Sequence, residues 1–419
     1  MTQLARRLGL SDAVVVGLSA MLGAGVFVAF APAARAVLST GAGAALLGAL
    51  AIAAVVAYCN ATSSAQLAAQ YPTSGGTYVY GRERLGPWWG YVAGWGFVVG
   101  KTASCAAMAL TFGAYAAPPG WERPVAIGAV VALAAVNYRG ITRTARVARW
   151  IVALVLLTLA VTVAVAWGGG SLDGSRVAGG GASPGTTDGL AAAYGVLQAA
   201  GLLFFAFAGY ARIATLGEEV RDPRRTIPRA IVVALGITVV VYAVVAVAVL
   251  AALGLDGTAG TTTPLAAAVA GTPWAGVVVR VGAAAASLGA LLALIAGIGR
   301  TTLAMAREGD LPRPLAAVHA RFQVPHRAEV ALAAVVCVLV ASVDLRGAIG
   351  FSSFGVLLYY AVANLAAWTQ TGTDRLYPRW PQALGLLGCV VLCVTVPVAS
   401  VLAGVAVLAV GLALRALRR

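Results

Sequence analysis

Charged residues are scarce in this chain. They make up 10% of its 419 residues, against 61% for hydrophobic residues, whereas an ordinary soluble domain carries about 25% charged residues. Lysine is nearly missing as well, because 28 of the 29 basic residues are arginine and Lys101 is the exception. This composition argues against a soluble enzyme or a soluble nucleic-acid-binding protein and favours an integral membrane protein.

Cysteine and histidine are also few, with five and two residues. The cysteines all lie in apolar segments, where free cysteine behaves as a small buried hydrophobic residue. Cys389 and Cys393 share a helix face, but no histidine or carboxylate stands near them in the sequence. We therefore expect no disulfide framework, no metal, no cofactor and no catalytic residue, and hence no enzyme.

The net charge of +15 would by itself suggest a nucleic-acid partner. The basic residues, however, sit in short clusters between long apolar runs, which is typical of a membrane protein. Arg6 and Arg7 precede an apolar run that resembles a secretion signal, but the run is long and similar segments follow it. We therefore expect a retained first span and no nucleic-acid partner.

Apolar segments long enough to cross a bilayer recur along the chain. A spanning helix needs about 20 mostly apolar residues. Beside a first span near the N-terminus and one around Lys101, charge-free windows cover residues 36–81, 124–138, 150–172, 189–211, 230–255, 257–279, 281–299, 330–343, 347–373 and 380–414. With these two spans the windows give twelve predicted transmembrane helices; the last window contains Pro397, and counts of eleven and ten stay open.

The arginines predict the orientation, because cytoplasmic loops carry an excess of Lys and Arg. With twelve spans and a cytoplasmic N-terminus, 23 basic residues fall in cytoplasmic connections and five in outer ones. The outer five are Arg35, Arg123, Arg176, Arg280 and Arg346. We predict a multi-pass protein of the cell membrane with both termini in the cytoplasm. The stretch from Gly168 to Gly189, rich in Gly, Ser, Thr and Pro, forms an extracellular loop between two halves.

Two apolar segments carry glycine at mid-membrane depth. The first reads MLGAGVF from Met21, and the sixth reads FFAFAGY from Phe204. Any one of these glycines is explained by close helix packing. Interruptions in the first helix of each of two halves favour broken helices instead, because unsatisfied backbone is tolerated in a membrane only where it lines a cavity.

The two interruptions would have opposite polarity. The first helix runs outward, so the half that begins near Gly25 directs free N–H groups toward the middle of the membrane, where they favour a carboxylate. The sixth helix runs inward, so its first half ends near Phe205 with unpaired carbonyls, which favour an ammonium. An α-amino acid satisfies both ends at once.

Five strings, in this order along the chain, resemble the amino acid, polyamine and organocation (APC) superfamily of permeases. They are GAGVF from Gly23, YPTSGGTYVYGRERLG from Tyr71, NYRG from Asn137, FFAFAGYARIATLGEEVRDPRRTIPRAI from Phe204, and AREGDLP from Ala306. The resemblance covers nearly the whole chain. It implies an all-α membrane protein with the leucine-transporter-type fold, in which helices 1 and 6 are discontinuous.

The family fold implies one transmembrane domain over residues 1–419. Its parts would be a first inverted repeat over 11–167, a second over 189–373, and two C-terminal helices over 380–416. The residues expected to bind the substrate are Met21, Gly23, Ala24, Gly25, Val26, Phe205, Ala206, Phe207, Ala208 and Gly209.

Individual roles at this site also follow from the resemblance. Backbone amides at Gly23–Gly25 would hold the carboxylate, and carbonyls around Met21, Phe205, Ala206 and Ala208 would hold the ammonium. The ring of Phe205 would cover the site. Many members have Ser or Thr at position 24, so the alanine here removes a hydroxyl contact.

Lys101 is our candidate for the residue that couples transport to a proton, because ionisable groups inside a membrane are functional by default. Desolvation favours its neutral amine, so its protonation would respond to substrate. Some proton-coupled members carry a lysine in the fifth helix, at the position of Val155 here. Lys101 either replaces that lysine, tunes substrate charge, or only pairs with a backbone carbonyl; snorkelling to an interface is the structural alternative.

We therefore predict a secondary active importer of an α-amino acid that works by alternating access, with the amino acid, the proton and the lipid bilayer as its partners. A fixed cation near the pocket disfavours lysine and arginine, so a neutral substrate is expected. Proton symport is preferred by elimination, since no acidic residue is evident in the spans. The alternatives are an exchanger of amino acids or polyamines and a non-transporting amino-acid sensor.

Overall fold

The computed structural model describes residues 8–72, 75–140, 145–168, 174–178, 189–217 and 219–417. Within these ranges the chain is helical and forms no strand, and an isolated bridge pairs Leu8 with Val220. Thr73, Ser74 and Glu218, which belong to two of the family-like strings, lie outside the described residues, as do 169–173 and 179–188 of the predicted extracellular loop.

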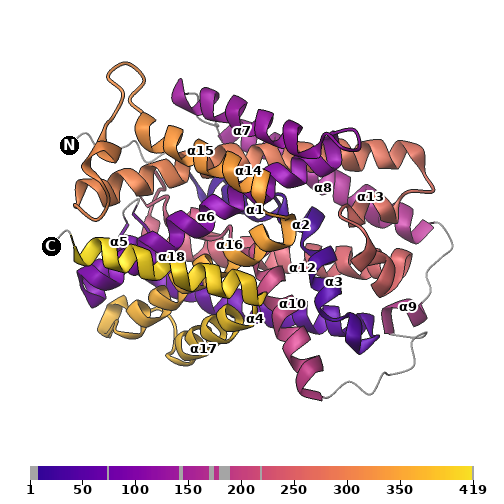
Figure 1. The fold of residues 1–419 in the computed structure, drawn as a ribbon. Helices are drawn as coiled ribbons and strands as arrows, with labels where there is room; N and C mark the ends of the chain where they lie inside the picture. The colour runs from indigo at the N-terminus through magenta and orange to yellow at the C-terminus, as the bar shows by residue number, and fades with distance from the viewer. Residues whose placement is uncertain are drawn as a thin grey trace.

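The described residues form eighteen α-helices, whose arrangement is drawn in Figure 1. They are α1 (Leu10–Met21), α2 (Gly25–Val28), α3 (Phe30–Ala36), α4 (Gly43–Gln70), α5 (Thr77–Leu85), α6 (Pro87–Ala116), α7 (Glu122–Tyr138), α8 (Ala145–Gly168), α9 (Gly174–Ala178), α10 (Gly189–Phe207), α11 (Ala211–Ala214), α12 (Pro223–Gly260), α13 (Pro264–Ala268), α14 (Pro273–Arg307), α15 (His326–Ser342), α16 (Leu345–Trp368), α17 (Trp380–Thr395) and α18 (Val398–Ala416). Three 3-10 turns, η1 (Leu38–Thr40), η2 (Arg313–Ala316) and η3 (Gly372–Asp374), join them.

Many of these helices are of membrane length. In the described part of the chain, nine helical segments are long and apolar enough to span a bilayer. The helices α7, α15 and α17, of 16 or 17 residues, lie among them. The chain is therefore a multi-pass membrane protein.

One predicted apolar window does not correspond to a helix of its own. Residues 257–279 hold the end of α12, the short helix α13 and the start of α14. Pro264 and Pro273 each stand in the first turn of a new helix, and Gly254 has a left-handed φ of 67°. Because proline cannot continue a helix that precedes it, apolar composition alone does not produce a span here.

Exposed tryptophans mark helix ends. Trp121 precedes α7, Trp150 lies in the first two turns of α8, Trp274 starts α14 and Trp380 starts α17. Between 58% and 74% of each residue is exposed. Tryptophan at the ends of apolar helices is typical of the two membrane–water interfaces.

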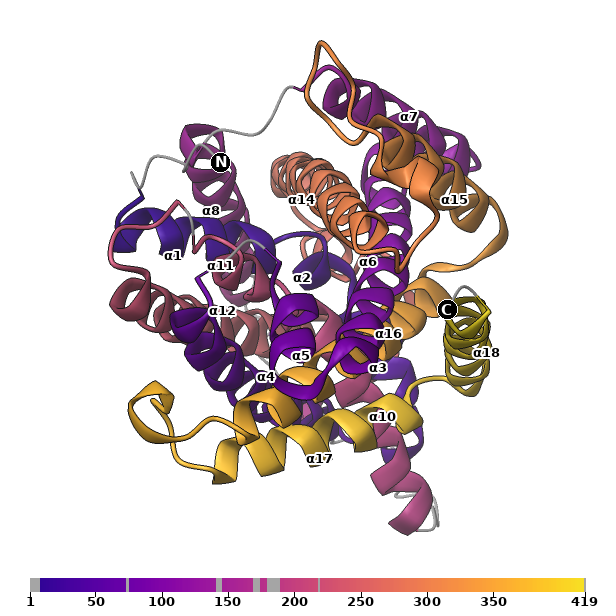
Figure 2. The same ribbon diagram turned by 90° about the vertical axis from the view of Figure 1, so that its left-hand side faces the viewer.

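The helix that carries Lys101 is packed backbone to backbone against α16. A Cβ placed on Gly355 of α16 would lie 2.7 Å from Cα of Gly100, and one on Gly100 would lie 3.0 Å from Cα of Gly355. Small residues allow helices to approach this closely in membranes. Figure 2 shows α6 and α16 together near the centre of the bundle, with α7 and α15 side by side at its edge.

A buried ion pair connects the last helix, α18, to the segment that follows α14. The Arg415 guanidinium of α18 lies 2.5 Å from an Asp310 carboxylate oxygen, and both side chains are at most 4% exposed. The guanidinium also lies over the rings of Trp88 and Tyr91, at 4.9 and 4.6 Å from their centroids. These cation–π contacts and the carboxylate compensate for the burial of the charge.

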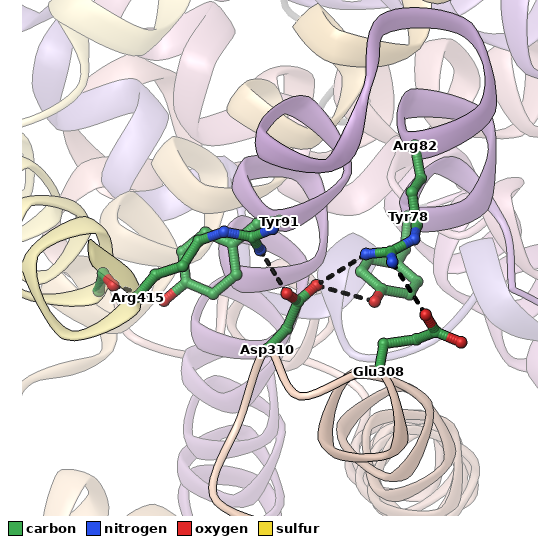
Figure 3. Close-up of polar contacts among 7 residues, drawn as sticks. Tyr78, Arg82, Tyr91, Glu308, Asp310 and Arg415 are labelled. Carbon is green, nitrogen blue, oxygen red and sulfur yellow. Dashed lines mark hydrogen bonds and ion pairs between the residues drawn. The ribbon is translucent and has the colours of Figure 1, made fainter. Parts of the chain in front are cut away.

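The same carboxylate reaches α5. The Tyr78 hydroxyl donates to Asp310 at 2.8 Å, and Arg82 lies 3.4 Å from Asp310 and 2.9 Å from Glu308 (Figure 3). Burial, together with the hydrogen bond to the carboxylate, raises the pKa of Tyr78, so its hydroxyl stays protonated and keeps donating. Asp310 thus joins α5, α18 and the segment after α14.

We expect Asp310→Asn to destabilise the protein by about 3–5 kcal/mol, because Arg415 would keep its buried charge without a counter-charge. Glu308→Gln removes a carboxylate that is 51% exposed, so a loss of about 0–1 kcal/mol is expected. Thermal unfolding in detergent would compare the two variants with the wild type. Equal losses would contradict the role given to Asp310.

Candidate functional site

The first long helical segment is interrupted where its glycines lie. Helix α1 ends at Met21, Leu22 leaves helical geometry with ψ of 39°, and α2 begins at Gly25. The second half of the segment therefore starts at the residue that the sequence indicated. All residues from Met21 to Val26 are buried.

The sixth segment is interrupted two residues later than predicted. Helix α10 continues to Phe207 rather than ending near Phe205, and Ala208, Gly209 and Tyr210 separate it from α11. The Phe207 ring is fully buried and lies 5.0 Å from the Tyr242 ring. The Gly209 amide donates to the Phe207 carbonyl at 2.7 Å, which closes a three-residue γ-turn where the helix ends.

The two interruptions cross each other in direct contact. A Cβ placed on Gly209 would lie 2.4 Å from the Ala20 carbonyl carbon and oxygen, and one on Gly25 would lie 2.7 Å from Cα of Ala206. Real Cβ atoms do not approach backbone so closely. The crossing therefore requires glycine at positions 25 and 209.

Side chains from other helices satisfy the backbone at this crossing. The Tyr242 hydroxyl of α12 lies 2.5 Å from the Met21 carbonyl oxygen and 3.0 Å from the Ala206 carbonyl oxygen. One hydroxyl group thus connects both interrupted segments. Because buried carbonyls without donors are costly in a membrane, this contact stabilises the break.

A second carbonyl, that of Ala208, receives two donors. The Lys101 Nζ atom donates to it at 3.2 Å from α6, and the Tyr360 hydroxyl donates to it at 3.3 Å from α16. Among the alternatives given for Lys101, the structure shows the contact with a backbone carbonyl. Three of the carbonyls predicted to hold a substrate ammonium, those of Met21, Ala206 and Ala208, therefore already have donors within the protein.

A cavity of about 870 Å³ lies beside the crossing. Helix α6 lines it with one face, on which Phe97, Lys101, Ser104 and Met108 recur at intervals of three and four residues. Helix α14 lines it mostly with small residues, namely Ala290, Ala293, Ala296, Gly297 and Ala304. These small side chains leave the room that the cavity occupies.

The cavity reaches one end of the bundle and is closed toward the other. Its wall includes Leu8, which precedes α1, and Ala304, near the end of α14. On the opposite side of the crossing, the rings of Phe27 and Tyr115 are buried 5.9 Å apart, and the Tyr115 hydroxyl donates to the Phe27 carbonyl at 2.7 Å. Among the described residues, the cavity thus extends from the crossing toward the end that holds Leu8 and Ala304, while buried aromatic rings occupy the opposite side of the crossing.

The structure separates the predicted substrate-binding residues into two groups. Phe205, Ala208 and Gly209 line the cavity, and so does the coupling candidate Lys101. Among the described residues, the others are buried behind its wall: Met21, Gly23, Ala24, Gly25, Val26, Ala206 and Phe207. They are covered because the crossing backbones touch and a Cβ on Gly23 would lie 3.0 Å from the Ala290 side chain.

Charged side chains of the cavity wall are mostly basic. Lys101, Arg212 and Arg300 line it together with Glu219. Val155, at the position of the fifth-helix lysine of some permeases, is fully buried on α8. Lys101 contacts the crossing through the Ala208 carbonyl.

Backbone hydrogen bonds join the loop after α11 to the residue Leu8, which precedes α1. The Leu8 amide donates to the Glu219 carbonyl at 3.0 Å, and the Arg221 amide donates to the Leu8 carbonyl at 2.9 Å. Farther along, Arg224 lies 3.4 Å from Asp374. The two interrupted segments are thus connected at the open end of the cavity as well as at the crossing.

Sequence reasoning missed Tyr242 and Tyr360. A signal was present, since each tyrosine lies inside a charge-free window and a buried tyrosine hydroxyl normally has a hydrogen-bond partner. The sequence does not say which carbonyl that partner is. Only the approach of α12 and α16 to the crossing decides it.

The family model for amino acid permeases matches residues 8–413. The chain belongs to the amino acid permease family. An uncharacterized transporter of Mycobacterium tuberculosis is 61% identical over 100% of this chain and 92% of its own length. The branched-chain amino acid permease BcaP of Bacillus subtilis is 25% identical over 77% of this chain and 72% of its own.

Two further similarities place the permease among known proteins. Cationic amino acid transporter 4 of Homo sapiens is 28% identical over 86% of this chain and 59% of its own. The crystal structure of MhsT in complex with L-phenylalanine covers 96% of this chain and 100% of its own, with a TM-score of 0.66 and 16% identity. The leucine-transporter-type fold and the family resemblance are thereby confirmed.

We expect Gly209→Ala to lower the thermal unfolding midpoint, at a cost of roughly 1–3 kcal/mol, because its Cβ would displace the Ala20 backbone. Gly236→Ala is the matched control, since a Cβ there meets nothing within 4 Å. In α12 that change should leave stability equal or raise it by up to about 1 kcal/mol. Shifts of the same sign and size would contradict the crossing.

Tyr242→Phe should loosen the crossing by removing its shared hydroxyl. We expect amide hydrogen exchange in residues 18–25 and 204–210 to become about tenfold faster, the effect of losing about one hydrogen bond. Tyr194→Phe, on a residue of α10 that is 41% exposed, is the control. Unchanged exchange in Tyr242→Phe would show that the contact does not stabilise the break.

Proposed function

We propose that the permease is a secondary active transporter that imports a neutral α-amino acid together with a proton, by alternating access. The observation that carries this proposal is the crossing of two interrupted helical segments at the closed end of a cavity of about 870 Å³. In membrane transporters, irregular backbone of this kind occurs where a substrate or ion binds.

The substrate would bind across the two interruptions. The carbonyl end of α10 suits the ammonium group, and the N–H end of the segment that begins with α2 suits the carboxylate, because the helix dipoles point in these directions. The proposed binding residues remain those around Gly23–Gly25 and Phe205–Gly209. Those now buried behind the wall would become accessible when the crossing opens to the other side.

The apolar wall supports a neutral substrate. Phe97, Met108 and Phe205 line the cavity close to Lys101. Lys101, Arg212 and Arg300 would repel a cationic side chain, whereas Glu219 is one acid among them. The similarity to a branched-chain amino acid permease fits this choice better than the similarity to cationic amino acid transporters does.

The extension of the cavity toward one end supports transport by alternating access. Rocking of one group of helices against the other would close the end near Leu8 and Ala304 and open the end near Phe27 and Tyr115. We assign the open end to the cytoplasm, because the excess of arginine predicts that the N-terminus lies there.

The full topology belongs to the same proposal. Twelve helices would span the cell membrane with both termini in the cytoplasm. Residues 11–167 and 189–373 would form the two inverted repeats, and residues 380–416 the two C-terminal helices. The interrupted segments would then be the first helix of each repeat, which is where transporters of this fold bind substrate.

Proteoliposomes would test this function with labelled L-leucine, L-phenylalanine, L-lysine and L-arginine. We expect a neutral amino acid to accumulate when the outer pH is about one unit below the inner pH, which supplies about 1.4 kcal/mol per proton. Without the gradient only equilibration is expected, and the two cationic amino acids should enter far more slowly.

Other outcomes would replace the proposal. Uptake only into liposomes preloaded with amino acid would identify an exchanger. Saturable binding without any flux would identify a sensor. Equal uptake with and without the pH gradient would exclude proton coupling while leaving amino acid transport in place.

A further inference from the structure

We propose that Lys101 changes its partner when the amino acid binds. Its neutral amine leaves the Ala208 carbonyl, takes up a proton and pairs as an ammonium with the substrate carboxylate, while the substrate ammonium takes the Ala208 carbonyl in its place. This inference rests on the proposed function and adds to it the residue that binds the carboxylate and carries the proton.

The position of Lys101 permits this exchange. The residue is 8% exposed, lies in the middle of α6 and lines the cavity. Its Nζ atom is 3.2 Å from a carbonyl oxygen that lies at the interruption of the sixth segment. A zwitterion that enters the cavity therefore meets the Lys101 amine and the Ala208 carbonyl together, next to its carboxylate and its ammonium respectively.

The existing contact of Lys101 is weak for a buried cation. Among the residues that the structure describes, no Asp or Glu forms an ion pair with Lys101. A neutral carbonyl compensates less for the lost hydration of an ammonium than a carboxylate does. Binding of the substrate carboxylate would therefore stabilise the protonated form of Lys101.

The charged and titratable groups around Lys101 do not offer the same compensation. Cys105 lies one turn farther along α6, and the Tyr360 hydroxyl of α16 shares the Ala208 carbonyl. Tyr78, Arg212, Glu219 and Arg300 line the same cavity from other segments. Glu219 is the acid of this set, and two arginines accompany it, so the surroundings attract an anion.

The proton would move in the direction of the substrate. On the outer side, the neutral amine takes a proton from solution, and the ammonium pairs with the incoming carboxylate. On the inner side, the carboxylate leaves first, the ammonium loses its partner, and the proton passes to water in the open cavity. The neutral amine then donates an N–H group to the Ala208 carbonyl, and the empty carrier returns.

This role requires lysine rather than arginine. All other basic residues of the chain, 28 in number, are arginine. A guanidinium stays protonated in proteins, whereas the amine of a buried lysine can give up its proton. The one position that carries the exception is the position that faces both the carbonyl and the cavity.

The test compares wild type, Lys101→Arg and Lys101→Met in binding L-leucine and its carboxamide, L-leucinamide. Calorimetry in buffers of different ionisation enthalpy, between about pH 6 and pH 9, measures how many protons are taken up with each ligand. We expect the wild type to take up a proton with leucine over part of this range. Lys101→Arg should bind leucine without proton uptake, because its cation is permanent.

Lys101→Met should bind leucine at least about tenfold more weakly, since a charge-assisted pair is lost. It should also lose most of the preference for leucine over leucinamide that the wild type shows. In proteoliposomes, Lys101→Arg should catalyse leucine exchange but no accumulation driven by a pH gradient. Gly236→Ala, outside the cavity, should behave as the wild type in every assay.

Two results would overturn the inference and leave the proposed function intact. One is leucine binding with the same proton uptake in Lys101→Arg as in the wild type. The other is an unchanged preference for leucine over leucinamide in Lys101→Met. A wild type that neither binds nor transports any neutral amino acid would instead refute the proposed function, and this inference with it.

Discussion

Two interrupted helical segments that cross within an apolar interior are the constraint on which this structure depends. Each interruption exposes backbone carbonyls and amides, and in a membrane these groups need partners from the protein. The hydroxyl of Tyr242 joins the Met21 and Ala206 carbonyls, and Lys101 and Tyr360 converge on the carbonyl of Ala208. Glycine at positions 25 and 209 lets the backbones touch, so the polar groups stay within reach of these three side chains.

The cavity is a consequence of the same arrangement. Where α14 passes the crossing, its alanines and glycine leave a space that α6 borders with Phe97, Lys101, Ser104 and Met108. The contact of α6 with α16 at Gly100 and Gly355 sets the rotation of α6 and thus the direction of its Lys101 face. As a result Lys101, the only lysine of the chain, faces both the cavity and the Ala208 carbonyl at the end of α10.

Particular residues show how far the sequence could predict the site. The string from Gly23 to Gly25 placed the first interruption correctly, because closely spaced glycines weaken a helix whatever surrounds them. The second interruption was predicted two residues too early, since the buried packing of Phe207 against Tyr242 extends α10. The window 257–279 failed as a span because hydropathy ignores the prolines that restart the helix.

The sequence alone determined that this protein lies in a lipid bilayer, which family it resembles and where its first helix is interrupted. These three conclusions follow from composition, from apolar segments and family-like strings, and from closely spaced glycines. The tertiary structure decided which predicted residues face the cavity and which are covered, and it supplied Tyr242 and Tyr360 as partners of the broken backbone. The physical reason is that a hydrogen bond between α12 or α16 and the crossing joins residues far apart in the chain. A local sequence pattern cannot predict which residues far apart in the chain come into contact. Only the packing of the helices brings the hydroxyl and carbonyl groups together.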